Sequence, residues 1–457
     1  LRTVSEGFDG PDQPAQHRGG RIATDTIYSP VGTKVIQTQP YYLATGSSTT
    51  AGANDQGLTL TEVDPLGRVT AVFVSDPQGL AGNKDFGLYG SGYGSRKAAV
   101  TRYSYNGLTT SISNDKGQVR TEERNAAGML VRITDPSGAQ LVHQHDAFGN
   151  LVATKDPLGN RILIQFDIRG RRLALNDPDA GLTQYDYNAL GEAVWSQSAN
   201  QRAATNPAHQ ATTMAYDKLG RMTSRVEPEG TGTWSYDKYA DNSACANGAG
   251  RLCESRFQRA GTSDVRATKT YYDALGRITS DVATVTNGPT MATAKSYDPS
   301  TGRLATKTYP TGLQVGYGYT ALGYPEKLKL LTSSNNWPNS LASNTVLWQA
   351  QIVNAWGKAE QQKYSNGVTS RSGYEAATGR ATALSAGTGS SGASLKNVLD
   401  HSYAWDSLNN LTWRADHIGD AVAGAVTETF EYADGLSRLT KYTVAAPAVP
   451  GGSRSVT

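Results

Sequence analysis

Short segments in which hydrophobic and polar side chains alternate make up most of the chain. In "GRMTSRVEP" (220–228), one side of an extended segment carries Met222 and Val226 and the other carries Arg225. This period of two, with many Thr, Val, Ile and Tyr residues, predicts β-strands. Neither side is apolar enough to form a dry core against a second sheet, so we expect a sheet that water contacts on both faces.

Two alternating turn signals separate these segments. The first is a phrase of the form Tyr-Asp-x-x-Gly-Arg, whose first four glycines below recur in steps of 21 residues. The second is Asp-Pro followed by glycine, midway between successive copies of the first. The positions that we assign as repeat turns are Gly128, Gly149, Gly170, Gly191, Gly220 and Gly276 in the first series, with the turn aspartates Asp135, Asp156 and Asp177 in the second.

Each signal has a mechanism for turning the chain. Proline presets φ, an aspartate side chain can cap the turn backbone, and glycine accepts a positive φ. A strand and a turn about every ten residues predict a long antiparallel meander of hairpins. The chain would supply roughly forty strands, and because open sheets of more than about ten strands curl or split, we expect this strip to coil.

Composition and charge exclude several classes of function. The 457 residues carry 43 basic and 40 acidic side chains without a run of either sign, which predicts no electrostatic binding of nucleic acid or anionic lipid. Glycine (49) and tyrosine (24) are abundant and phenylalanine (7) is scarce, a turn-rich and β-rich composition. No apolar stretch approaches the ~18 residues of a membrane span.

The repeated phrase resembles a known family. Segments such as "YYDALGRITSDV" (271–282), "HDAFGNLVATKDPLGN" (145–160) and "YPTGLQVGYGYTALGY" (309–324) are similar to the YD-repeat or Rhs family. This family includes bacterial Rhs polymorphic toxins, the C components of insecticidal Tc toxin complexes, and the extracellular domain of teneurins. The resemblance implies an all-β fold in which a strip of sheet is wound into a hollow, cocoon-like shell, and in the toxin branches this shell encloses a C-terminal toxic domain.

One departure from the family bears on activity. Rhs proteins typically close the shell with a C-terminal motif whose aspartates cleave the chain, and no such motif follows Tyr432. The similar stretches at Asp64 and Asp156 fall within the repeat rhythm, so we interpret them as turns. We therefore expect a fragment of a longer protein, without a toxin domain, catalytic activity or cofactor. A hydrolase that uses Asp64 and Asp156 is the least favoured alternative.

Three other groups of residues have both a functional and a structural interpretation. Cys245 and Cys253 flank the turn sequence "NGAG", which favours a disulfide across a hairpin over two separate thiols. His143 and His145 lie on the same side of a strand and could be metal ligands, but ordinary strand surface is favoured. The aspartates of the Asp-Pro series could form a calcium ladder, although each is explained by its own turn. We predict no metal site.

We predict one architectural domain with three regions. Residues 1–100 hold irregular repeats, residues 101–330 regular repeats, and residues 331–457 longer repeats with loop insertions. The leading hypothesis is a shell segment of a secreted bacterial toxin, whose main partner is the remainder of its own polypeptide; a host or target-cell surface is a second candidate partner. The alternative is an adhesion or carbohydrate-binding protein of the cell surface. Self-association through open sheet edges is a further expectation.

Overall fold

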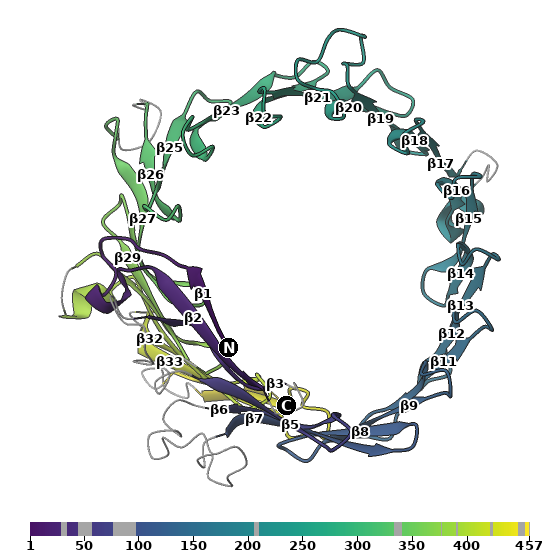
Figure 1. Ribbon diagram of the computed structural model, residues 1–457. Coiled ribbons are helices and arrows are strands. Elements are labelled where there is room, and N and C mark those ends of the chain that lie inside the picture. The colour runs from purple at the N-terminus through teal and green to yellow at the C-terminus, as the bar shows by residue number, and fades with distance from the viewer. Residues whose placement is uncertain are drawn as a thin grey trace.

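The computed structural model describes residues 1–28, 34–43, 57–75, 97–204, 210–332, 341–375, 377–389, 392–420, 424–446 and 453–456. Its strands form a single 35-stranded sheet. From β5 onward, every strand pairs antiparallel with the strand that follows it along the chain. The strip bends into a ring, one sheet thick, around an open centre (Figure 1).

The first part of the strip begins near the N-terminus and runs through the first half of the ring. Its strands are β1 (Arg2–Glu6), β2 (Arg21–Tyr28), β3 (Lys34–Thr38), β4 (Tyr41–Tyr42), β5 (Leu58–Val63), β6 (Val69–Ser75), β7 (Lys97–Asn106), β8 (Thr109–Asn114), β9 (Val119–Arg124), β10 (Leu130–Thr134), β11 (Gln140–His145), β12 (Leu151–Lys155), β13 (Arg161–Phe166), β14 (Arg172–Asp177), β15 (Gly181–Tyr187) and β16 (Ala193–Gln197).

The second part completes the ring and continues past its start. Its strands are β17 (Thr212–Tyr216), β18 (Met222–Glu227), β19 (Gly230–Tyr236), β20 (Leu252–Arg259), β21 (Val265–Tyr272), β22 (Ile278–Val285), β23 (Met291–Tyr297), β24 (Leu304–Thr308), β25 (Gln314–Tyr319), β26 (Pro325–Leu330), β27 (Val346–Val353), β28 (Ala359–Tyr364), β29 (Thr369–Tyr374), β30 (Ala381–Gly387), β31 (Leu399–Trp405), β32 (Leu411–Asp420), β33 (Gly424–Glu431), β34 (Lys441–Ala445) and β35 (Ser453–Val456).

Few residues depart from the meander. Strand β2 pairs with β1, β3 and β4 along different parts of its length. The helix α1 (Ala199–Ala203) is an insertion between β16 and β17, and Ser198 caps it because its side chain accepts from the amide of Gln201. The described residues contain no helix long and apolar enough to cross a membrane. The sheet does not close on itself, since β1 pairs only with β2 and β35 only with β34 among the described strands.

The sheet is a single layer with little core, as the two polar faces predict. Most residues of β8–β18 are only partly buried. Small groups of buried apolar side chains occur instead, such as Ala23, Tyr41 and Leu43 near the N-terminus and Ala71, Phe73 and Val100 on β6 and β7. The stability of such a strip rests mainly on its hydrogen-bonded ladders and on contacts between neighbouring repeats.

The hydrogen-bonded ladder runs without interruption across both predicted region boundaries. Strands β6, β7 and β8 pair in order across residue 100, and β25, β26 and β27 pair in order across residue 330. The division at these positions concerns repeat regularity and stays a prediction. The described part of the chain holds 35 strands, whereas the expected spacing gave roughly forty. Longer connections, such as residues 237–251, account for the difference.

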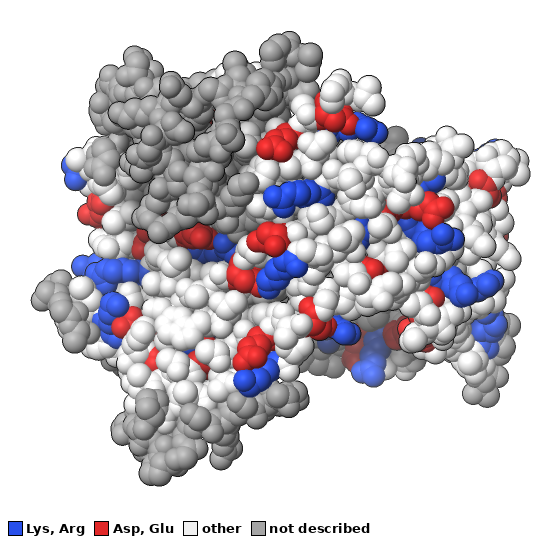
Figure 2. Space-filling view, turned by 90° about the horizontal axis from the view of Figure 1, so that it is seen from below, with Lys and Arg blue, Asp and Glu red and all other residues white. Residues whose placement is uncertain are grey.

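Positive and negative side chains alternate over the surface. Figure 2 shows basic and acidic groups as neighbouring pairs on the face in view, without a patch of one sign. Many of these pairs lie within one repeat, for example Arg277 with Asp273 at 2.7 Å and Arg171 with Asp167 at 2.6 Å. Because these charges lie beside a partner of opposite sign, the face in view has neither an electropositive nor an electronegative patch.

Candidate functional site at the corners and the seam

The Tyr-Asp phrase is a corner in which one aspartate organises the turn. In the corner after β21, the Asp273 Oδ1 accepts the amides of Leu275 and Arg277, each at 2.9 Å, and its Oδ2 accepts the Arg277 Nε at 2.7 Å. The Gly276 amide donates to the Asp273 carbonyl at 2.9 Å. Gly276 has a φ of +76°, a conformation that favours glycine. The motif therefore encodes a closed hydrogen-bonded turn.

Successive corners are joined to one another through the arginine and the tyrosine. The Arg277 guanidinium lies 4.3 Å from the centre of the Tyr297 ring, which belongs to the next corner. The Tyr297 hydroxyl donates to the Ile278 carbonyl at 2.8 Å, directly after the arginine. The same stacking recurs in the pairs Arg68–Tyr105, Arg171–Tyr187, Arg221–Tyr236, Arg251–Tyr272, Arg303–Tyr319 and Lys358–Tyr374. Where an arginine or lysine follows the turn, the corner thus contacts its neighbour by a cation–π interaction, and in pairs such as Arg277–Tyr297 also by a hydrogen bond.

Hydrogen bonds to the corner carboxylates keep them ionised. The backbone amide of Arg221, followed by its side chain, lowers the pKa of Asp217. The side-chain amide of Asn150 has the largest effect on the pKa of Asp146, which is also lowered. These shifts have the cause expected for a carboxylate that accepts several N–H groups. Such lowered pKa values are those of carboxylates in structural turns, and they do not indicate a pair of groups that acts as acid and base.

All six glycines assigned as repeat turns have a positive φ. The values are +80° for Gly128, +88° for Gly149, +75° for Gly170, +90° for Gly191, +76° for Gly220 and +76° for Gly276. At the equivalent position of the corner after β31, an asparagine, Asn409, has a φ of +69°. The left-handed conformation is therefore a requirement of the corner, and asparagine can meet it.

Replacing Gly149 by valine is expected to lower the free energy of unfolding by about 1–2 kcal/mol, because a β-branched residue is strained at positive φ. A Cβ at this position would meet only the Met129 sulfur, at 3.6 Å, so the effect would come from the backbone. Urea unfolding followed by far-UV circular dichroism measures it. Gly149→Asn is the matched control and should be nearly neutral; equal losses in the two variants would contradict the conformational explanation.

The three turn aspartates of the Asp-Pro series lie at the other ends of the strands. Asp135 accepts the Ser137 amide at 2.8 Å, Asp156 accepts the Asn160 amide at 2.8 Å, and Asp177 accepts the Asp179 amide at 2.8 Å. Within the described ranges, no three His, Cys, Asp or Glu residues are grouped so that they could hold a metal ion. The structure thus gives each aspartate a role within its own turn.

The Nδ1 atom of His143 lies 3.1 Å from the Thr154 hydroxyl of the neighbouring strand. The histidine beside it, His145, has a buried Nδ1 without a hydrogen-bond partner. Burial, with a smaller contribution from His145, lowers the pKa of His143. The contacts of this pair are those of strand side chains.

Because the strands alternate in direction, the strip has two edges made of turns. We call one the Tyr-Asp rim; its described corners include residues 64–67, 125–128, 146–149, 167–170, 188–191, 217–220, 237–251, 273–276, 298–302, 320–323, 354–357, 377–379, 406–409 and 434–437. We call the other the Asp-Pro rim; its described turns include residues 114–117, 135–138, 156–159, 177–181, 260–264 and 309–312 and the helix α1, and near the N-terminus residues 7–20 and Gly57.

The two rims meet where the strip passes its own start, and we call this contact the seam. At one end of it, the buried Gln13 side chain bonds both backbone groups of Val353: its Nε2 donates to the carbonyl at 2.9 Å and its Oε1 accepts the amide at 3.0 Å. The Tyr42 hydroxyl donates to the same carbonyl at 3.0 Å. Burial raises the pKa of Tyr42 to about 12, which keeps this hydroxyl a donor.

Further along the seam the contacts are between turns. The Lys116 ammonium pairs with the Asp406 carboxylate at 2.5 Å, and the Gln118 side chain donates to the Asp434 carbonyl at 3.3 Å. Gly57 approaches Ala377 so closely that a Cβ on the glycine would lie 2.3 Å from the Ala377 Cα. The partners are 290 to 340 positions apart in sequence. One winding of the strip therefore contains about this many residues.

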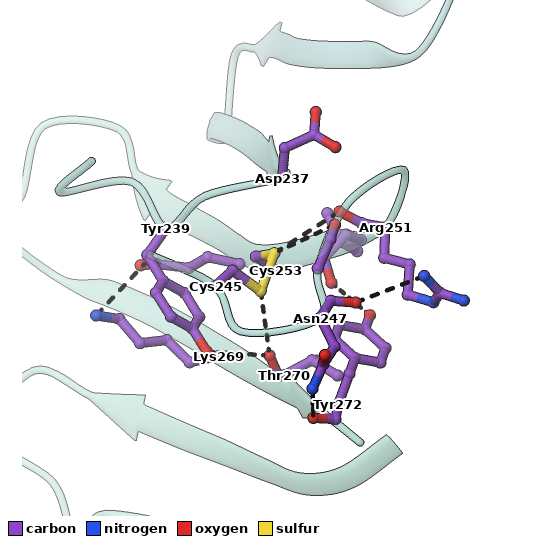
Figure 3. Close-up of a disulfide and its surroundings, with 12 residues drawn as sticks. Asp237, Tyr239, Cys245, Asn247, Arg251, Cys253, Lys269, Thr270 and Tyr272 are labelled. Carbon is purple, nitrogen blue, oxygen red and sulfur yellow. Dashed lines mark hydrogen bonds and ion pairs between the residues drawn. A yellow bond between two sulfur atoms is a disulfide. The ribbon is translucent and has the colours of Figure 1, made fainter. Parts of the chain in front are cut away.

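The long corner of residues 237–251 carries the disulfide. Cys245 of this corner is joined to Cys253 at the start of β20, as the turn between them predicts. With Tyr239 they form a small buried cluster, against which Tyr272 packs (Figure 3). A Cβ on Gly248 would lie 2.3 Å from the Cys245 sulfur and 2.6 Å from the Cys253 sulfur, so only glycine fits at this position of the turn. The insertion is thus folded against the rim.

Replacing both cysteines by alanine is expected to destabilise this corner by about 2–3 kcal/mol, from the chain entropy of a loop with a sequence separation of 8. Hydrogen exchange of residues 237–251 measures the effect locally. Exchange in the corner after β21 serves as the control and should be unchanged. A loss of protection that spread around the ring would contradict the assignment of the disulfide to one corner.

Comparisons with known proteins bear on the repeat and on the fold. The model of the RHS repeat family matches residues 124–161. No curated protein matches the chain. Among solved structures, TcdB2-TccC3 without its hypervariable C-terminal region has a TM-score of 0.67 at 16% identity, over 100% of this chain and 25% of that chain.

A second crystal structure of TcdB2-TccC3 gives a TM-score of 0.65 at 16% identity, over 95% of this chain and 24% of that chain. A Tc holotoxin pore from Photorhabdus luminescens gives 0.50 at 15% identity, over 95% and 24%. The chain therefore spans about a quarter of the length of the solved chains that it matches. At these identities the likeness concerns the fold: a wound strip of antiparallel hairpins.

Proposed function

Because the chain belongs to the YD/Rhs-repeat family, we propose that it is a wall segment of a toxin shell that encloses a cargo polypeptide. One observation carries the proposal: a sheet one layer thick winds around an open centre and joins its own next winding along a seam (Figure 1). A wound strip with sealed windings makes a wall, whereas a binding module of the same length would bury its apolar side chains in a core.

The proposal includes where the protein works. The Cys245–Cys253 link supports assembly in an oxidising compartment, and therefore secretion or display at a cell surface. We assign no catalytic step to the segment, since Asp64 and Asp156 are both engaged in their own turns: Asp64 accepts the Leu66 and Arg68 amides, each at 2.9 Å. The partners would be the other parts of the same shell and its cargo.

Two measurements test the wall function. Small-angle scattering of the chain should give the distance distribution of a curved, hollow particle, and a compact solid particle would overturn the proposal. In the whole protein that contains this segment, the cargo should resist a protease that rapidly digests the isolated cargo. Equal digestion of enclosed and isolated cargo would contradict encapsulation even if the particle were hollow.

One surface groove supports a second candidate, carbohydrate binding. A groove of about 370 Å³ on β18–β21 is lined by the aromatic rings of Trp234 and Phe257 and by Arg225 and Arg266. The Trp234 ring lies over Gly232, where a Cβ would be 3.0 Å from its edge, which leaves an aromatic floor beside charged groups. Binding on a glycan array that Trp234→Ala abolishes would support this candidate, and an array without signal would exclude it.

A further inference from the structure

The groove on β18–β21 lies on one face of the sheet, in a part of the ring away from the seam (Figure 1). Residues that pair directly between neighbouring strands point to the same face. Four lining residues form one such row, because Gly232 pairs with both Arg225 and Phe257, and Phe257 pairs with Arg266. Since the groove is on a face, a further winding that joins at a rim leaves it open.

Two buried glycines shape the floor of the groove. The Trp234 ring lies over Gly232, where a Cβ would be 3.0 Å from it, and the Phe257 ring lies over Gly230, where a Cβ would be 2.7 Å from it. Aromatic rings commonly fill the space above glycines in a sheet, so this packing by itself implies no ligand. Phe257 nevertheless stays 37% exposed, so the groove keeps an apolar surface that a ligand can reach.

The charges around the groove leave one arginine without a partner. Arg225 is paired with Glu227, and Arg256 lies 3.6 Å from the Glu254 carboxylate. Arg266 is exposed, and among the described residues no carboxylate lies at ion-pair distance from it. It stands at one end of the row of paired residues. A free guanidinium beside an apolar floor suits a planar anion, because its N–H groups match both oxygens of a carboxylate.

Polar side chains complete the lining. Ser255 and Thr268 are paired across β20 and β21, and both line the groove. At the other end, the Arg225–Glu227 pair supplies hydrogen-bond donors and an acceptor. A sugar ring uses this combination, because it has an apolar C–H face and a rim of hydroxyl groups. The volume of about 370 Å³ also lies within the range of roughly 300–1,000 Å³ of small-molecule sites.

The strand pairing disfavours an extended peptide as the occupant. Such peptides bind by adding a strand to an open sheet edge. Each of the strands β18–β21 is already paired on both sides, so its backbone groups are engaged within the sheet. A ligand in the groove must therefore be recognised by side chains, as a sugar is.

We propose that this groove binds a glycan that carries a carboxylate, such as a hexuronate or sialic acid residue, with the sugar ring on Trp234 and Phe257 and the carboxylate on Arg266. The Arg225–Glu227 pair then bonds ring hydroxyls. The inference rests on the carbohydrate-binding candidate and names its ligand class, and it is independent of the wall function.

A glycan array with matched probes tests the proposal. It carries glycans of glucuronate, galacturonate, mannuronate and sialate, each beside its carboxyl-reduced form, in which a neutral hydroxymethyl group replaces the carboxylate. The original chain should bind at least one acidic glycan, and the reduced form about tenfold more weakly. Arg266→Gln should lose this preference and bind the reduced form as the original chain does.

Arg161→Gln is the control, because it removes an exposed arginine from β13, outside the groove, and should keep the preference. Both arginines are exposed, so both variants should keep the circular dichroism spectrum and unfolding midpoint of the original chain.

The outcomes separate the inference from the candidate on which it rests. Equal binding of acidic and reduced glycans that Trp234→Ala abolishes would keep carbohydrate binding and overturn the carboxylate ligand. A preference for acidic glycans that persists in Arg266→Gln would place the anion elsewhere and would also overturn the proposal. An array without signal would overturn both, and the wall function would still be decided by the scattering and protease measurements.

Discussion

Replacing Gln13 by leucine is expected to open the seam at its N-terminal end and to lower the free energy of unfolding by about 2–4 kcal/mol. Leucine fills a similar volume but takes the seam partner from the half-buried Val353 amide and removes one donor from its carbonyl. Leaving a buried backbone group unsatisfied costs about 1–3 kcal/mol. Urea unfolding gives the total effect, and hydrogen exchange of the Val353 amide shows whether the seam is where stability is lost.

Gln351 provides a matched control, because it lies on strand β27 two residues before Val353. The Gln351 side chain donates to Asp12 across the seam at 3.3 Å, but this contact is exposed to water. Gln351→Leu also removes the acceptor of the Gln361 side chain on the neighbouring strand, at 2.9 Å, so it should lower stability by about 0.5–1.5 kcal/mol, still less than Gln13→Leu. If Gln351→Leu and Gln13→Leu had equal effects, burial would not be the reason for the role of Gln13, and the seam would be only a polar contact between windings.

Acid is expected to unfold the corners together, with the loss beginning near pH 4. Hydrogen bonds lower the pKa of the corner aspartates in the folded protein, among them Asp146, Asp217 and Asp434. A carboxylate whose folded pKa lies below its unfolded value of about 3.9 stabilises the fold above that value, and this contribution is lost as the pH falls through the folded pKa. Because equivalent carboxylates recur around the ring, far-UV circular dichroism should show a steep transition below about pH 4.

Asparagine at a corner provides the control for this acid transition. Asn125 and Asn188 already occupy the aspartate position in two corners, where each caps the turn through its side-chain oxygen. Asp217→Asn should therefore keep the turn at Arg221 but remove one titrating group, so that the transition becomes less steep. A transition whose midpoint and steepness are the same in the variant would assign acid unfolding to groups other than the corner carboxylates.

The repeat made the corners predictable from local chemistry. Aspartate, proline and glycine act within four residues, so that positions such as Gly149 and Asp135 could be assigned to turns without knowledge of distant contacts. The prediction of a coiled single-layer strip followed from the two polar faces and the strand number. The Cys245–Cys253 link was likewise a local inference, since the turn between the cysteines brings them opposite one another.

The arginine of the phrase was the main residue whose role was missed. We assigned no role to the arginine that follows the corner glycine, whereas Arg277 and its equivalents stack on the tyrosine of the next corner. The signal was present in the sequence, because arginine follows the turn in about half of the copies. Its recognition requires knowing that the next tyrosine, some twenty residues later, lies directly beside it.

The seam could not be predicted from the sequence. Its partners are about three hundred positions apart, and their pairing depends on the curvature that the whole strip accumulates. Nothing local distinguishes Gln13 from an ordinary surface glutamine, and no motif marks Val353 as its partner. Long-range contacts of this kind are set by the sum of many small twists between strands, each of which varies by several degrees.

Because seam partners lie about one winding apart, 290 to 340 positions along the chain, the seam fixes the number of hairpins in a winding. Adding or removing one hairpin between residues 119 and 320 would displace every later corner by one place relative to the turn beneath it, so that Asp406 and Lys116 would no longer meet. Extra residues at a corner, as in 237–251, leave the count of strands unchanged and can be accommodated at the rim. We therefore expect length variation among related chains to fall at corners, with whole repeats gained or lost only beyond the last seam contacts, which involve Asp434 and Ser437.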